Sequence, residues 1–108
     1  MNNRDAVFPS NPHALYEQHH YSPAVRSGDL LFVSGQVGAR QDGSPETDLT
    51  KQVQLAFDNL NALLSAAGCT FDDVVDVTLF ILDPEKNFDV IWPVLGSNWG
   101  EKPGQPPF

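Results

Sequence analysis

One tyrosine and a serine–glycine pair are the side chains of this sequence best placed for chemistry. Tyr21 opens the predicted strand Tyr21–Val25, and Ser34 and Gly35 lie in a second predicted strand, Phe32–Gln36. A phenol can orient water or donate a hydrogen bond, but it stays protonated at neutral pH and is a weak base. Ser34 has no evident base to make it a nucleophile. A glycine within a strand marks either a bulge or a close approach to the backbone, and both interpretations of Gly35 stay open.

The three histidines raise the question of a metal site or of proton transfer, because imidazole titrates near neutral pH. His19 and His20 are adjacent, so on a strand they point to opposite faces and do not readily share one ion. Neither they nor His13 are accompanied by a spaced set of cysteines or carboxylates. We therefore expect solvated histidines and no metal site.

The strands that must position Tyr21 and Ser34 form a predicted hairpin. The residues between them, Ser27-Gly28-Asp29, are a turn cluster. Pro23 has no N–H group for a ladder hydrogen bond, which predicts an edge strand or a local irregularity there. Residues 1–20 are mostly polar and are expected to run extended before the hairpin.

A long amphipathic helix is predicted from Leu49 to Ala67, where apolar residues recur at spacings of three and four. Asp48 is a suitable N-cap for this helix, and Gly68 is a suitable C-terminal stop. Cys69, the only cysteine of the chain, follows the helix. A chain with one cysteine forms no intrachain disulfide, so we expect it in the reducing cytoplasm.

A second helix is predicted from about Glu85 to Trp99. Pro93 in its interior removes a hydrogen bond, which predicts a kink or a late start near Ile91. Residues 100–108 form a proline-rich tail that cannot continue the helix. The apolar stripe expected to face the core comprises Phe88, Ile91, Trp92, Leu95 and Trp99.

Between the two helices, Val74–Leu82 is mostly apolar on both faces of a strand, which predicts a central, covered strand. The order strand, strand, helix, strand, helix predicts an α+β fold with two helices packed on one face of a mixed sheet. Three strands alone build such a layer poorly, so something should complete the sheet.

The chain has 108 residues, and we expect a single domain, 1–108. Its 14 acidic and 6 basic residues give a net charge of −8, which disfavours binding to nucleic acid. No apolar run approaches the roughly 20 residues of a membrane span, so no membrane association is expected.

Several dispersed motifs together resemble the RidA (YjgF-like, endoribonuclease L-PSP-like) family of reactive-intermediate deaminases. They are Tyr21-Ser22-x-Ala24-Val25, Phe32-Val33-Ser34-Gly35-Gln36, Gln52 with Asp58-Asn59-Leu60, Ala66-Ala67-Gly68 and Asp72-Asp73-Val74-Val75. The resemblance implies a chorismate-mutase-like fold, a homotrimer, and a cleft at each subunit interface that binds a small metabolite. In that cleft the family hydrolyses enamine or imine intermediates to keto acids and ammonia, without a metal or cofactor.

By the same resemblance, Tyr21 corresponds to the family's catalytic tyrosine, and Ser34 and Gly35 correspond to backbone that lies against the ligand. The family's substrate-binding arginine is matched by Gln105, which offers neutral hydrogen bonds in place of a bidentate ion pair. Trp92 stands where the family often has an asparagine. The closing strands, with the glutamate thought to position water, have no counterpart before Phe108.

Three functions therefore stay open. The first is a metabolite-binding member that hydrolyses enamines or imines, and the second is a non-catalytic member that binds a ligand. The third is an endoribonuclease that inhibits translation, which the acidic charge disfavours.

Overall fold

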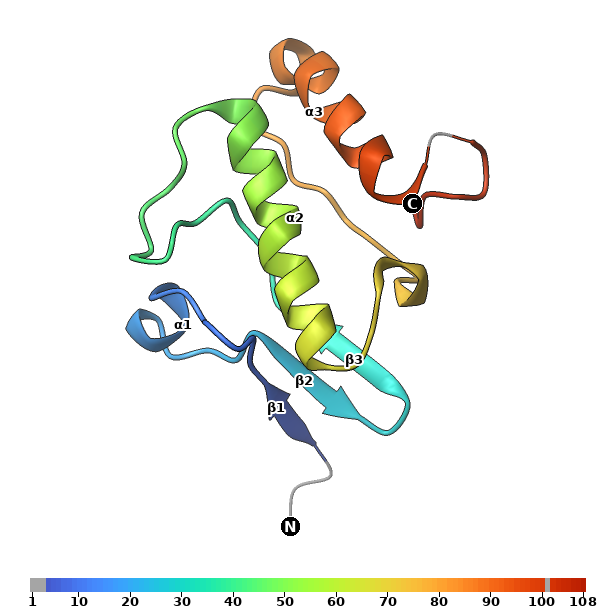
Figure 1. Ribbon diagram of the computed structural model, residues 1–108. Helices are drawn as coiled ribbons and strands as arrows, with labels where there is room; N and C mark the ends of the chain where they lie inside the picture. The colour runs from blue at the N-terminus through green and yellow to red at the C-terminus, as the bar shows by residue number, and fades with distance from the viewer. Residues whose placement is uncertain (1–3, 101) are drawn as a thin grey trace.

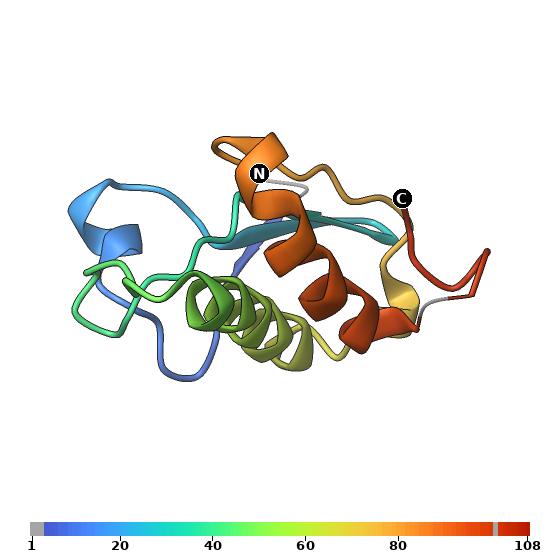
Figure 2. The same cartoon turned by 90° about the horizontal axis from the view of Figure 1, so that it is seen from above.

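The computed structural model describes residues 4–100 and 102–108 and has an α+β architecture (Figure 1). A three-stranded antiparallel sheet has the order β1-β2-β3. The helix α2 lies across one face of this sheet, and α3 packs against α2 (Figures 1 and 2). The elements are β1 (Asp5–Val7), α1 (Leu15–Gln18), β2 (Ala24–Ser27), β3 (Leu30–Val33), α2 (Leu49–Ala66), the 3₁₀ helix η1 (Phe71–Asp73) and α3 (Pro84–Trp99).

The α+β fold class is confirmed, while the described sheet is antiparallel where a mixed sheet was expected. The segment 1–20 was expected to be extended; residues 1–3 lie outside the described residues, and residues 4–20 are not simply extended, because β1 pairs with β2 and one turn of helix, α1, follows. This added strand makes β2 the middle strand of the sheet. Pro23 lies just before β2, so its missing N–H removes no ladder bond.

The helix α2 follows the sequence prediction closely. The Asp48 carboxylate accepts a hydrogen bond from the Lys51 N–H at 3.0 Å, as expected of an N-cap. Gly68 ends the helix with φ +78°, and Cys69 N–H donates to the Leu64 carbonyl at 2.8 Å. This pairing is a Schellman motif, whose left-handed position favours glycine.

The core lies between α2 and α3, where Phe57, Ile91 and Leu95 are buried together. Trp99 joins this core and donates from Nε1 to the Phe71 carbonyl at 2.9 Å. The helix α3 begins at Pro84 and continues through Pro93, so the expected late start near Ile91 is wrong. Pro84 suits a first helical position because its fixed φ is already helical.

The predicted buried stripe of α3 is only partly correct. Phe88 and Trp92 are exposed and stack on each other with ring centroids 5.0 Å apart. Trp92 is one residue after the buried Ile91 and so points about 100° away around the helix. Phe108 in the tail contacts Trp92 and Trp99 with its ring edge-on.

The prediction of a covered strand at Val74–Leu82 is wrong within the described residues. The segment is irregular, and Val77 N–H donates to the Pro107 carbonyl at 3.2 Å. Val75, Phe80 and Leu82 are 87%, 95% and 89% exposed. A strand needs a partner for its backbone groups, and none of the described strands pairs with this segment.

Candidate functional site

The helix α1 shapes the surroundings of Tyr21. His19 caps this one-turn helix and His20 has φ +56°, so the two histidines do not lie on a strand as expected. The left-handed turn at His20 reverses the chain, and Tyr21 N–H donates to the Tyr16 carbonyl at 3.2 Å. The rings of Tyr16 and Tyr21 then meet edge to face at 5.0 Å.

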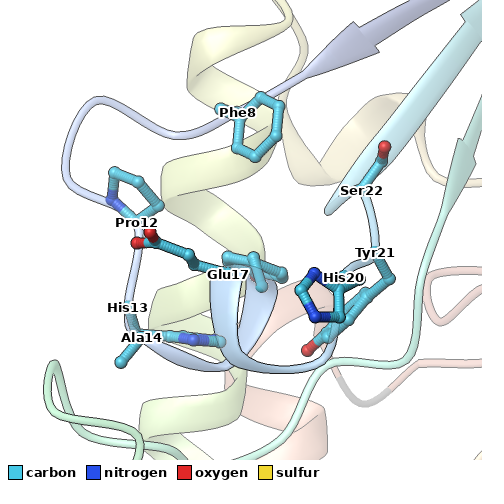
Figure 3. A pocket seen from close by; sticks show the side chains of 9 residues that line it. Phe8, Pro12, His13, Ala14, Glu17, His20, Tyr21 and Ser22 are labelled. Carbon is cyan, nitrogen blue, oxygen red and sulfur yellow. The ribbon is translucent and has the colours of Figure 1, made fainter.

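Tyr21 lines an open hollow of about 580 Å³ (Figure 3). Burial raises the pKa of its phenol above the usual value near 10, so the hydroxyl stays protonated at neutral pH. Within the described residues this hydroxyl has no hydrogen-bond partner. Tyr21 is therefore suited to donate a hydrogen bond or orient water. The hollow is lined by Phe8, Pro12, His13, Ala14, Tyr16, Glu17, His20, Tyr21 and Ser22.

Ser34 lies just past the end of β3 and is held against the residues that follow Tyr21. Its hydroxyl donates to the Ser22 carbonyl at 2.6 Å, and its N–H donates to the Pro23 carbonyl at 3.0 Å. The structure thus brings Ser34 next to the Tyr21 segment. Because the Ser34 hydroxyl already donates to a carbonyl, a positioning role suits it better than a nucleophilic one.

Gly35 is exposed and has open space where a side chain would be. The bulge interpretation, in which Gly35 lets a helix pack closely, is therefore not supported. The glycine that packs closely against a helix is Gly38, since a methyl group there would overlap the Gln52 carbonyl of α2. The backbone at Gly35 is open to a ligand.

Gln36 and Tyr16 join α1 to the Ser34 segment, and sequence reasoning did not single them out. Gln36 Nε2 donates to the Ser34 carbonyl at 3.0 Å, and Gln36 Oε1 accepts from the Tyr16 hydroxyl at 3.4 Å. A helix of four residues has too few positions to show a period in the sequence, so the burial of Tyr16 left no signal there.

His13 is buried, contrary to the expectation of a solvated histidine. Its ring stacks on Tyr16 at a centroid distance of 4.2 Å, and its Nδ1 accepts from the Leu15 N–H at 3.3 Å. Burial lowers the pKa of this imidazole. Within the described ranges, no group of three or more histidine, cysteine or acidic side chains could hold a metal ion.

Gln105 does not meet Tyr21 within one chain. It lies in a turn of the tail, where its Oε1 accepts from the Lys102 N–H at 3.0 Å. Both views place the tail at the opposite end of the molecule from α1 (Figures 1 and 2). A cleft that contains both residues needs a second subunit.

The family model for endoribonuclease L-PSP matches residues 11–107. The chain belongs to this family. This confirms the resemblance carried by the dispersed motifs from Tyr21 to Val75, since endoribonuclease L-PSP and RidA-like describe the same group. Among the helices of the described residues, none has both the length and the hydropathy to cross a membrane.

One relative and one solved structure are similar to this chain over most of its length. The RutC family protein YjgH of Escherichia coli K12 is 59% identical over 103 residues, which are 95% of this chain and 79% of YjgH. A structure of protein YJGH has 58% identity and a TM-score of 0.91, and the match covers 97% of this chain and 80% of that one.

A more distant relative carries an activity in its name. The 2-iminobutanoate/2-iminopropanoate deaminase of Dermatophagoides farinae is 36% identical over 71 residues, which are 64% of this chain and 52% of the deaminase. The chain spans about half the length of this deaminase and of other distant curated relatives.

Proposed function

We propose that this chain is the subunit of a homotrimer that hydrolyses small enamine or imine intermediates to keto acids and ammonia. Tyr21, Ser34 and Gly35 form one wall of a cleft between subunits. The observation that carries the proposal is the free Tyr21 hydroxyl beside an open hollow, on a segment to which the Ser34 hydroxyl is hydrogen-bonded through the Ser22 carbonyl. Membership of the family and the name of the deaminase relative support the same reaction.

The reaction needs water at the imine carbon and proton transfer to nitrogen. Water adds to the C=N carbon, and the resulting carbinolamine expels ammonia and leaves a ketone, with no change of oxidation state. Tyr21 would donate a hydrogen bond to the imine nitrogen or hold the attacking water, and its raised pKa keeps the donor proton in place. No cofactor is required for this chemistry.

Exposed apolar side chains support the proposed trimer. Phe80 and Leu82 in the unpaired segment, and Phe32 on β3, are largely exposed. Large exposed apolar groups of this kind are typical of surfaces that contact another protein. A second copy would cover them and bring its own residues toward Tyr21. A cytoplasmic location is proposed from the single cysteine.

The test uses 2-aminoacrylate, generated in the assay by a serine dehydratase. The wild type should accelerate its loss, with pyruvate and ammonia formed in equal amounts. Tyr21→Phe should lower kcat/KM at least about 100-fold, since a positioned proton donor contributes about 10²–10⁴-fold. Tyr16→Phe, which removes the hydroxyl of the neighbouring ring, is the matched control and should retain activity within about threefold. A wild-type rate equal to buffer would exclude the hydrolase.

A non-catalytic, ligand-binding member of the family is the second candidate, favoured by the position of Gln105. Its amide is engaged in its own turn with Lys102, and glutamine does not replace an arginine for a carboxylate. This candidate predicts a saturable thermal shift with pyruvate but no turnover of 2-aminoacrylate, and Gln105→Arg should then remain inactive.

A further inference from the structure

The hollow beside Tyr21 is walled mainly by rings. The Phe8 ring meets the Tyr16 ring edge to face with centroids 6.5 Å apart, and the His13 ring stacks on the Tyr16 ring with centroids 4.2 Å apart. Figure 3 shows Phe8 and Pro12 on one side of the hollow, with Tyr21 and His20 facing them. A volume of about 580 Å³ lies within the usual range of ligand sites, roughly 300–1,000 Å³, and is far larger than a three-carbon imine needs.

The hollow shares Tyr21 with the candidate site. Tyr21 and Ser22 line it, and the Ser22 carbonyl accepts the hydrogen bond that holds Ser34. A substrate bound at Tyr21 therefore has this hollow beside it. Phe8 is 50% exposed there, so its apolar face is available for contact.

Charge sets the orientation of an imino acid in this position. Glu17 lines the hollow, and its carboxylate is directed toward Pro12 (Figure 3). A substrate carboxylate placed in the hollow would meet this like charge, which is unfavourable. The apolar side chain of the substrate suffers no such repulsion and gains contact with Phe8.

We infer that this hollow is the side-chain subsite, and that it selects imino acids with a large apolar or aromatic side chain over three-carbon ones. The inference rests on the proposed function, whose cleft it extends. The substrate side chain contacts Phe8, Pro12 and His13. Tyr21 donates a hydrogen bond or orients water at the reacting carbon.

The experiment compares imines made in the assay from phenylalanine and from alanine by amino acid oxidases, with the remaining imine trapped by semicarbazide. The wild type should hydrolyse the phenylalanine-derived imine with a kcat/KM at least about tenfold higher, as expected for added apolar contact in a pocket. Phe8→Ala should lower the ratio of the two kcat/KM values about tenfold. Phe8→Leu keeps an apolar side chain, so it should also lower this ratio of kcat/KM values, but by less than Phe8→Ala does.

Phe88→Ala is the matched control, because Phe88 is an exposed phenylalanine on α3, outside the hollow, and should leave the ratio unchanged. A wild-type ratio near one, or a ratio that Phe8→Ala does not change in a folded protein, would overturn the inference. If no imine is hydrolysed, the proposed reaction has failed and the subsite is judged by calorimetric titration. Phenylpyruvate should then bind at least about tenfold more tightly than pyruvate, with the difference lost in Phe8→Ala; equal binding would contradict the subsite.

Discussion

His13 shows how one buried side chain links the stability of the N-terminal region to pH. Among the described residues it is the one polar or charged side chain that is buried, at 7% exposure. Its Nδ1 accepts a backbone hydrogen bond, which requires that the proton of the neutral ring sits on Nε2. Burial beside Tyr16 disfavours the charged ring and lowers its pKa below the usual value near 6.5.

We expect acid to destabilise the fold through His13. As the pH falls below about 6.5, the unfolded chain takes up a proton at this histidine before the folded chain does. The contribution of the neutral His13 ring to the free energy of unfolding is therefore complete above pH 6.5. It decreases as the pH falls toward the lowered pKa of the folded state. Urea unfolding at pH 7.5 and pH 5.5 measures this loss.

His13→Leu should show a smaller drop in the free energy of unfolding between these two pH values than the wild type. His19→Gln, a change in an exposed histidine of the same region, controls for the loss of one imidazole. Equal drops in the wild type and His13→Leu would contradict this role of His13.

At the scale of elements, the loop after β3 is held against α2 by side-chain hydrogen bonds to its backbone and by a close approach of the two backbones. The Asn59 side chain donates to the carbonyls of Val37 and Ala39, each at 3.1 Å. Gly38 between them is buried and lies directly on the Gln52 carbonyl. The turn of α2 at Gln52 therefore fixes where the Ser34 segment can run.

Gly38→Ala should lower the free energy of unfolding by about 1–3 kcal/mol, as overpacking of a close contact does. The added methyl group would overlap the Gln52 backbone, which cannot move without distorting α2. Gly35→Ala is the matched control, because a methyl group there meets open space and should change stability by less than about 1 kcal/mol. Urea denaturation with an unchanged m-value checks both, and equal effects would show that Gly38 makes no such contact.

At the scale of the whole molecule, the irregular segment 74–82 is paired with none of the described strands and leaves large apolar side chains without cover in one chain. Val75, Phe80 and Leu82 are its most exposed members. Backbone that pairs with no strand of its own chain can pair with another chain. In the proposed trimer, a neighbouring subunit would pair with this backbone and cover these side chains.

Sedimentation velocity should give three times the mass of one chain at micromolar concentration. Phe80→Asp should shift the protein toward the single chain, because a carboxylate in an apolar contact loses its hydration. Phe88→Asp, a change at an exposed ring of α3, should leave the assembly intact. A wild type that sediments as one chain would contradict the trimer.

The sequence alone predicted the elements whose causes are local. The helix α2 follows from its apolar period, from Asp48 at its start and from Gly68 at its end, and all three lie within the segment they determine. The turn at Gly28 likewise joins β2 and β3, although both strands begin and end a few residues away from their predicted bounds. The motifs dispersed between Tyr21 and Val75 together predicted the family, which the family model confirms.

Tertiary structure decided the rest, because those features depend on residues distant in the sequence. The apolar pattern of Val74–Leu82 indicated a covered strand, yet pairing requires a neighbour, and none of the described strands supplies one. His13 was expected to be solvated, but it stacks on Tyr16 and is buried, and Gly38 rather than Gly35 is the glycine that packs closely against α2. Period and capping are properties of one segment, whereas burial and pairing are properties of two segments that meet in space.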